Sequence, residues 1–295
     1  MPYIEHIFYR DEGAGIPVLF IHCPALDHTY WRPSVDHLMG ICRCISFDIR
    51  GHGQSGKGTE PWGFADIAED VALLTERLNL RRPILVGYSS GACIALQTAL
   101  DYPDKFGALV LVSAFSECTT TRLRAKVLIG LAAVRLGLAR HVGRKLVITN
   151  NVGEDHAQAM LRQAQGVRPQ ALRSFLRAAL RFNVTRRLPE IKVPVLLVYG
   201  ASDRILLPHY RILRSGLPNV QAVLFPATDH RVPTRRPAEF AKLLAAFRGS
   251  LERPTARPQP ESAVAPRGIP VHQYHDTPDP NPGTAQEIEP TVRPF

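Results

Sequence analysis

The sequence predicts an α/β fold, in which a doubly wound, mostly parallel sheet carries an inserted helical lid. Short continuous apolar runs such as residues 17–22 recur along the chain, and they are typical of parallel strands that are covered on both faces. Stretches with apolar residues at helical spacing, such as 64–78, separate these runs. Residues 115–189 break the alternation, because they have helical periodicity and no strong strand signal.

The expected elements follow in chain order. Residues 4–9 alternate as an edge strand does, and 11–15 hold the acidic and glycine residues of a turn. Apolar runs predict further strands at 17–22, 43–48, 84–86, 108–113 and 194–200, and a last strand at 220–225. Apolar periodicity predicts helices at 30–39, 64–78 and 93–100.

One short motif, Gly87-Tyr88-Ser89-Ser90-Gly91, joins the 84–86 strand to the helix that follows it. A strand that turns sharply into a helix exposes the serine at its centre, and the glycines two before and two after it leave room for the tight turn. The motif therefore predicts a nucleophile elbow with Ser89 as the nucleophile. The alternative is an ordinary loop rich in glycine and serine.

Composition narrows the class of protein. The 295 residues are 45% hydrophobic, which is enough to build a core, and the five scattered cysteines predict reduced, buried thiols. No apolar stretch reaches membrane-spanning length, and no secretory signal pattern begins the chain. A cytoplasmic location without a membrane span is therefore expected.

The formal net charge is +10, and residues 119–187 hold 14 Lys and Arg against two acidic residues. No helix-turn-helix, zinc-finger or RNA-binding aromatic pattern accompanies these charges, so no nucleic-acid partner is expected. Arg173, Arg177 and Arg181 form a like-charged row at i, i+4. This row is either a solvated face or a positive field that attracts an anionic substrate.

The expected organisation is the first part of a core, 1–114, a helical lid, 115–189, the second part of the core, 190–250, and a tail, 251–295. The tail is rich in proline and poor in periodic apolar residues, so it is expected to be disordered. His272, His275 and Asp276 form a weak metal-like pattern in it. Because no further ligands accompany them, they are expected to be solvated, and no metal site is expected.

Further motifs follow the other expected strands. They are His22 before a loop, Asp48-x-Arg50-Gly51-His52-Gly53-x-Ser55, Gly200-x-x-Asp203, and Asp229-His230. Together with the elbow, they resemble the α/β-hydrolase family over about residues 17–247.

The resemblance implies the α/β-hydrolase fold and a catalytic triad in the chain order Ser89, Asp203, His230. Alone, Asp203 is more often a helix cap and His230 a surface side chain. Glu117 is the spare acid, since some relatives carry their carboxylate on the earlier strand. The other two motif histidines, His22 and His52, are expected to be structural.

The resemblance also implies an oxyanion hole, a pair of backbone N–H groups that stabilise negative charge on the substrate oxygen. One donor is expected from Ser90 and the other from the loop at Cys23 and Pro24. Because proline has no N–H, Pro24 leaves three alternatives: a shifted loop in which Cys23 or Ala25 donates, a side-chain donor, or weak acyl transfer. Asp229 departs from the family too, because glycine commonly precedes the histidine; its carboxylate is expected to face solvent.

These features predict a serine hydrolase that cleaves a small carboxylic ester, lactone or related acyl compound through an acyl-serine intermediate, without metal or organic cofactor. The resemblance is strongest to the lactonase, esterase and non-haem haloperoxidase-like branch. Two alternatives stay open: acyl transfer to an acceptor other than water, and a non-catalytic or weakly catalytic ligand-binding protein, which Pro24 motivates. The expected partner is a small molecule, anionic if the arginine row acts on it, and the oligomeric state stays open.

Overall fold

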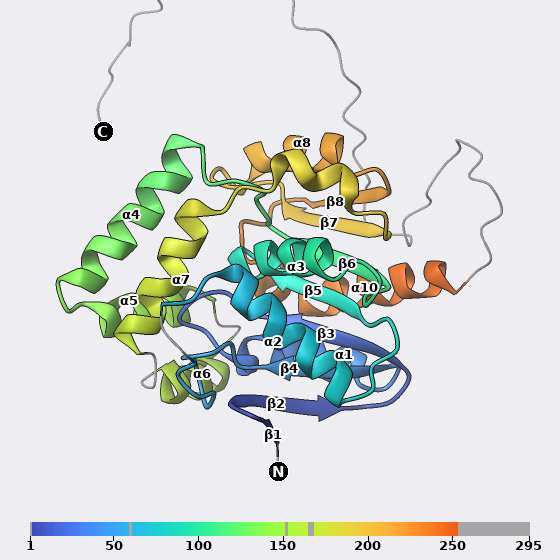
Figure 1. The fold of residues 1–295 in the computed structure, drawn as a ribbon, viewed down its shortest axis with the longest axis horizontal. Coiled ribbons are helices and arrows are strands. Elements are labelled where there is room, and N and C mark those ends of the chain that lie inside the picture. Colours follow the sequence, from blue (N-terminus) through green and yellow to red (C-terminus); the bar gives the residue numbers. More distant parts are fainter. Residues whose placement is uncertain (1, 59–60, 151–152, 165–167, 253–295) are drawn as a thin grey trace, which may run out of the picture. The chain divides into compact units, whose positions relative to one another are not determined.

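The computed structural model describes residues 2–58, 61–150, 153–164 and 168–252. Within these ranges eight strands form one sheet in the order β1-β2-β4-β3-β5-β6-β7-β8 (Figure 1). The strands are β1 (Tyr3–Ile4), β2 (Ile7–Glu12), β3 (Ile16–Ile21), β4 (Cys42–Phe47), β5 (Ile84–Tyr88), β6 (Ala108–Val112), β7 (Val195–Gly200) and β8 (Val220–Phe225). The pairs β1·β2 and β2·β4 are antiparallel, and all the other pairs are parallel. The predicted doubly wound, mostly parallel α/β class is confirmed.

Helices cover both faces of the sheet, because successive strand residues point to opposite sides. In β3, Leu19 and Ile21 join one hydrophobic cluster and Val18 and Phe20 join another. The core helices are η1 (His28–Trp31), α1 (Arg32–Leu38), α2 (Phe64–Arg77), α3 (Ser90–Asp101), α8 (Leu207–Gly216), α9 (Val232–Arg235) and α10 (Pro237–Leu251). Helices α2 and α3 contribute to the first cluster, and α1 and α10 to the second.

A helical segment lies between β6 and β7, where the sequence predicts the lid. Its helices are α4 (Thr121–Arg135), α5 (Ala139–Asn150), α6 (Glu154–Ala164), α7 (Pro169–Arg181) and η2 (Thr185–Glu190). Figure 1 shows α4 to α7 grouped beside the carboxyl ends of the parallel strands. Val134, Ala139 and Leu172 from this segment pack on Ala25 in the loop after β3. These helices therefore contact the edge of the sheet at which ligands bind in open α/β folds.

Two local expectations differ from the structure. Asp11 and Glu12, expected in a turn, continue β2 and pair with Ile45 and Cys44, because the antiparallel ladder with β4 extends that far. The helix expected from residue 30 begins as a 3₁₀ turn at His28, where Asp27 caps it by accepting from the backbone N–H of Thr29 (2.8 Å). The five cysteines are free and buried, as predicted. The proline-rich tail from residue 253 lies outside the described residues.

Candidate active site

Ser89 lies at the sharp junction between β5 and α3, with φ 56° and ψ −124°. A positive φ is unusual for a residue with a side chain and marks a strained backbone. The flanking glycines are required by space: a Cβ on Gly87 would lie 2.5 Å from Cα of Ala92, and one on Gly91 would lie 2.5 Å from the carbonyl oxygen of His22. The elbow therefore has the geometry that the motif predicts.

Ser89, His230 and Asp203 are joined by two hydrogen bonds. Nε2 of His230 lies 3.1 Å from Oγ of Ser89, and Nδ1 of His230 lies 2.8 Å from Oδ2 of Asp203. Because the carboxylate accepts from Nδ1–H, the lone pair on Nε2 faces the serine hydroxyl and can accept its proton. The spare acid, Glu117, accepts instead from the Thr119 hydroxyl (3.0 Å).

The Asp203 carboxylate is buried and fully engaged. Its second oxygen, Oδ1, accepts from the backbone N–H groups of Ile205 (3.2 Å) and Leu206 (3.0 Å). Burial alone would raise the pKa of Asp203, but the hydrogen bond and charge of His230, together with these backbone donors, hold it below its ordinary value. Asp203 is therefore an anion able to orient an imidazole and to stabilise its protonated form.

Two residues outside the predicted motif centres bring these side chains together. A Cβ on Gly200, the last residue of β7, would lie 2.0 Å from the carbonyl oxygen of Asp229, so only glycine lets the loop bearing His230 approach the strand bearing Asp203. Ser113, directly after β6, donates from Oγ to the carbonyl oxygen of His230 (3.3 Å). Gly200 belongs to the Gly200-x-x-Asp203 motif, but only the packing shows why a glycine is needed there. No sequence pattern marks Ser113 as a contact of His230.

Pro24 lies in the loop between β3 and η1. In this loop, Leu26 N–H donates to the carbonyl oxygen of Cys23 (3.3 Å), and Ala25 has a positive φ of 61°. In the described part of the chain, the N–H groups of Cys23 and Ala25 donate no hydrogen bond to protein, and Ser90 N–H lies in the first turn of α3, where helix N–H groups lack helical partners. The N–H groups of Cys23 and Ala25 therefore have no protein acceptor in the described ranges.

Two of the motif histidines are buried and neutral. His22 accepts from Ile49 N–H at Nε2 (3.0 Å) and donates from Nδ1 to the carbonyl oxygen of Cys23 (2.8 Å). Burial lowers the pKa of His22 to about 3 and that of His52 to about 4. The ring of His52 packs edge-on against Phe175 of α7. The hydrogen bonds of His22 and the ring packing of His52 fit the structural roles that the sequence predicts for these two histidines.

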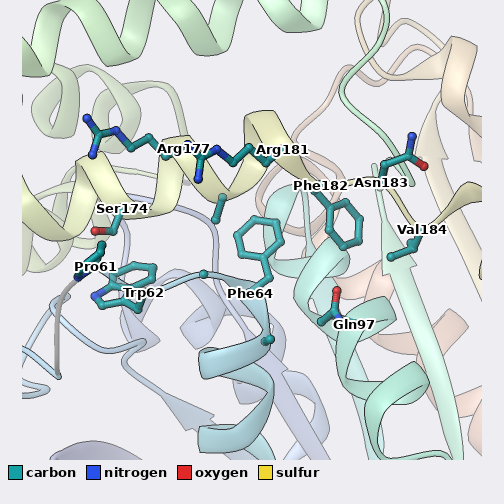
Figure 2. A pocket seen from close by; sticks show the side chains of 13 residues that line it. Pro61, Trp62, Phe64, Gln97, Ser174, Arg177, Arg181, Phe182, Asn183 and Val184 are labelled. Atoms are coloured by element: carbon teal, nitrogen blue, oxygen red, sulfur yellow. The ribbon is translucent and has the colours of Figure 1, made fainter.

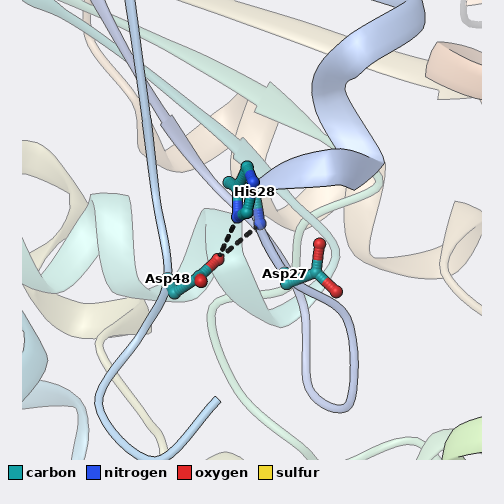
Figure 3. A group of neighbouring side chains, drawn as sticks. All are labelled: Asp27, His28 and Asp48. Atoms are coloured by element: carbon teal, nitrogen blue, oxygen red, sulfur yellow. Dashed lines mark hydrogen bonds and ion pairs between the residues drawn. The ribbon is translucent and has the colours of Figure 1, made fainter. Parts of the chain in front are cut away.

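Asp27, His28 and Asp48 form a buried polar cluster where the loop after β3 enters η1 (Figure 3). Their side-chain ligand atoms lie within 4.8 Å of one another, as in a metal site. Protein donors already engage them, however. Oδ1 of Asp48 accepts from both N–H and Nδ1 of His28 (2.7 Å each), and Oδ2 accepts from Gln54 N–H (2.8 Å). The cluster therefore fits a hydrogen-bonded brace that ties the loop after β3 to the loop after β4.

Replacing each of the two aspartates of this brace by asparagine should affect the free energy of unfolding differently. Burial opposes ionisation of Asp48, but the bond and charge of His28 lower its pKa, whereas burial and the Asp48 charge raise the pKa of Asp27 to about 6. Near pH 7, Asp48→Asn should lower the free energy of unfolding by about 2–3 kcal/mol, the worth of a hydrogen bond to a charged group. Asp27→Asn should cause no loss, because it removes an unfavourable charge and keeps the helix cap.

Urea unfolding at several pH values distinguishes the two variants. A lowered folded-state pKa stabilises above the unfolded value, so the deficit of Asp48→Asn should shrink as the pH falls below about 4. The raised pKa of Asp27 acts in the opposite sense: its cost in wild type should begin to fall below about pH 6 and should disappear below about pH 4, the ordinary value of an unfolded aspartate. Equal losses for both variants at every pH would contradict this account.

Residues adjacent to Ser89 and His230 in the chain hold the end of α5. Tyr88 donates from its hydroxyl to Oδ1 of Asn150 (2.9 Å), and Arg231 donates from Nη1 to the carbonyl oxygen of Thr149 (2.7 Å). Arg231 also pairs with Asp229, which lowers the pKa of that carboxyl to about 2. Asp229 is therefore part of an ion pair at the surface rather than a free solvated carboxylate. We call the Tyr88–Asn150 and Arg231–Thr149 hydrogen bonds the α5 latch.

Removing one hydroxyl from the α5 latch should loosen α5 selectively. Tyr88→Phe leaves Asn150 without its donor, which should lower the free energy of unfolding by about 1–2 kcal/mol and speed amide hydrogen exchange in α5. Tyr199→Phe is the matched control, because it also deletes a buried tyrosine hydrogen bond, to the carbonyl oxygen of Ala114 (2.7 Å). It should destabilise the core without a selective effect on α5. Equal exchange in α5 for both variants would contradict the latch.

An α/β sheet that places a linked serine, histidine and aspartate at its carboxyl edge defines a class of hydrolytic enzymes. Comparison with known proteins agrees. The family model described as the alpha/beta hydrolase fold matches residues 16–131. A protein of Agrobacterium fabrum, provisionally named carbamate hydrolase RutD, is 32% identical over 230 residues, which are 74% of this chain and 87% of that protein. The chain belongs to the α/β-hydrolase family.

A further relative supports the predicted enzyme class, and a solved structure has the same fold. The 2-(acetamidomethylene)succinate hydrolase of Mesorhizobium japonicum is 28% identical, over 81% of this chain and 90% of that enzyme. The structure of a thermophilic esterase from Thermogutta terrifontis, with malate bound, superposes with a TM-score of 0.73 at 22% identity, covering 84% of this chain and 94% of that one. The chain is thus an enzyme of the hydrolase class. None of the helices in the described ranges is long and apolar enough to cross a bilayer.

Proposed function

We propose that this enzyme is a serine hydrolase that cleaves a small acyl compound through a covalent acyl-Ser89 intermediate. The observation that carries the proposal is the continuous hydrogen-bonded chain from Ser89 through His230 to Asp203. A serine hydroxyl is a weak nucleophile near neutral pH, so it needs a base within hydrogen-bonding distance and a group that orients the base. The three side chains meet both requirements.

In the proposed reaction, Oγ of Ser89 attacks the substrate carbonyl carbon while its proton passes to Nε2 of His230. The resulting tetrahedral oxyanion collapses, and the leaving alcohol takes the proton from His230. Water then attacks the acyl-serine ester, again with His230 as base, and releases the acid and free Ser89. Asp203 keeps the imidazole in the reactive tautomer and stabilises its cationic form throughout.

The backbone N–H of Ser90 is the first oxyanion donor in this proposal. Pro24 has no N–H to donate, so the second donor is the N–H of Cys23 or Ala25, the residues on either side of Pro24, which donate to no protein acceptor in the described part of the chain. The Cys23 thiol stays protonated near neutral pH, because burial raises its pKa to about 12. It therefore adds no negative charge beside the proposed oxyanion.

The proposed substrates are small carboxylic esters and lactones, with carbamates and amides added because two relatives carry those activities in their names. A carboxylate-bearing substrate fits the basic lid segment, which carries 14 Lys and Arg between residues 119 and 187. A panel of p-nitrophenyl esters, lactones, carbamates and N-acyl substrates, each with and without a carboxylate, tests this choice. Higher kcat/KM for the anionic member of each pair at low salt, and a smaller preference at high salt, would support it.

The rival function is ligand binding with little or no acyl chemistry, and Pro24 is the observation that favours it. Intact-protein mass after treatment with a fluorophosphonate separates the two functions. Wild type should gain one covalent adduct under conditions that label a known serine hydrolase. If it gains none, the acyl-enzyme proposal fails. Acyl transfer to an added alcohol or amine, measured against hydrolysis, distinguishes the acyltransferase alternative.

A further inference from the structure

A hollow lies where α7 meets the amino end of α2 and the middle of α3 (Figure 2). Its volume is about 620 Å³, within the size range of small-molecule sites. The lining residues come from three segments: 61–65, which enter α2; Gln97 of α3; and 174–184, which contain the end of α7.

Aromatic side chains form the floor of this hollow. Trp62, Phe64 and Phe182 line it, and Phe64 packs edge-on against Phe182 with ring centroids 5.3 Å apart. The Nε1–H group of Trp62 is buried and has no hydrogen-bond acceptor in the described part of the chain. These rings are largely buried, with Trp62 and Phe64 4% and Phe182 7% exposed, so they form an apolar floor on which a small aromatic or aliphatic group can pack.

Arginine side chains form its rim. Arg177 and Arg181 stand one helical turn apart on α7 and lie along the upper edge of the hollow in Figure 2. No aspartate or glutamate is among its lining residues, and the neighbouring Asp101 is engaged by Gln97 (2.7 Å) and Arg187 (3.8 Å). Two like charges a turn apart repel each other, and an anion placed between them would relieve that cost.

The hollow is separate from the predicted catalytic centre. Ser89, Asp203 and His230 are not among its lining residues. Gln97, which lines it, lies seven residues beyond Ser90 along α3, or roughly 10 Å at 1.5 Å per residue.

We propose that this hollow binds a small amphipathic carboxylate, with its apolar body on the aromatic floor and its carboxylate on Arg177 and Arg181. Because the lining residues come from the α2 and α3 region of the core and from the α7 region of the inserted segment, the bound anion bridges the two. The site thus provides a means for an organic acid, such as the acid product of a hydrolase, to stabilise the position of α7. Binding at this site does not depend on the chemistry proposed for Ser89.

Titration of the whole chain with 2-naphthoate, followed by tryptophan fluorescence, tests the proposal. The chain has two tryptophans; Trp62 lines the hollow, and Trp31 is fully buried in the hydrophobic cluster on the other face of the sheet. Wild type should show a saturable change, and the neutral analogue 2-naphthalenemethanol should bind at least roughly tenfold more weakly, because it lacks the charge-assisted bonds. Trp62→Phe should remove the optical change while calorimetry still detects binding.

Charge-matched variants locate the anion. Arg177→Gln and Arg181→Gln should each raise the dissociation constant roughly tenfold, as expected for the loss of one charge-assisted hydrogen bond. Arg214→Gln, which removes an exposed charge from α8, should leave it unchanged. Ser89→Ala should bind 2-naphthoate as wild type does, so failure of the acyl-enzyme proposal leaves this one testable. Equal binding of the neutral analogue, wild-type affinity in both arginine variants, or protection of Ser89 from the fluorophosphonate by 2-naphthoate would overturn it.

Discussion

Replacement of Ser89 by alanine is expected to abolish covalent labelling by a fluorophosphonate and to lower ester turnover by at least about 10⁴-fold. Alanine removes the only atom that attacks the carbonyl carbon in the proposed reaction, while binding and the backbone oxyanion donors remain. The small side chain also fits the strained backbone at φ 56° no worse than serine does, so the fold should persist. Intact mass and turnover of the best substrate from the panel measure the two effects.

Ser215→Ala is the control for this experiment. Ser215 is an exposed serine on α8 whose hydroxyl bonds the carbonyl oxygen of Arg211 (2.9 Å), so its loss should change neither labelling nor turnover. If Ser89→Ala still accepts one label with wild-type stoichiometry, another residue is the nucleophile. If it hydrolyses the substrate at the wild-type rate, the acyl-enzyme route is wrong.

Asp203→Asn is expected to lower kcat by about 10³–10⁴-fold. An asparagine can still accept from the N–H groups of Ile205 and Leu206, so the turn after β7 should stay intact. It carries no charge to stabilise a cationic His230, and its amide N–H₂ group favours the tautomer in which the proton sits on Nε2. The imidazole then cannot accept the proton of Ser89.

The matched variant is Glu117→Gln, which neutralises the other carboxylate that the sequence offers. Because Glu117 bonds Thr119 and not His230, its change should alter kcat less than about twofold. Thermal unfolding of both variants checks that each is folded at the assay temperature. A larger loss in Glu117→Gln than in Asp203→Asn would move the acid to the strand before the inserted helices.

The site residues differ in how far the sequence predicts them. Ser89 is marked by its own glycines, and a Cβ at either glycine collides with backbone in the folded chain, so this signal is local and steric. Asp203 and His230 are marked by their order after strands, because parallel strands deliver their carboxyl ends to one edge of the sheet. Ser113 and Asn150 have no such mark. Ser113 bonds His230, 117 positions away, and Asn150 bonds Tyr88, 62 positions away.

By itself the sequence determined the class of fold, the order of the strands along the chain and the position of the elbow. These features depend on periodic burial and on local backbone sterics, which neighbouring residues encode. Only the tertiary structure decided which acid meets His230, which donors the loop containing Pro24 leaves available, and how α5 is tied to the residues beside Ser89 and His230. The contacts of His230 and of α5 join residues up to 82 positions apart, and their geometry depends on how the whole sheet and the inserted helices pack.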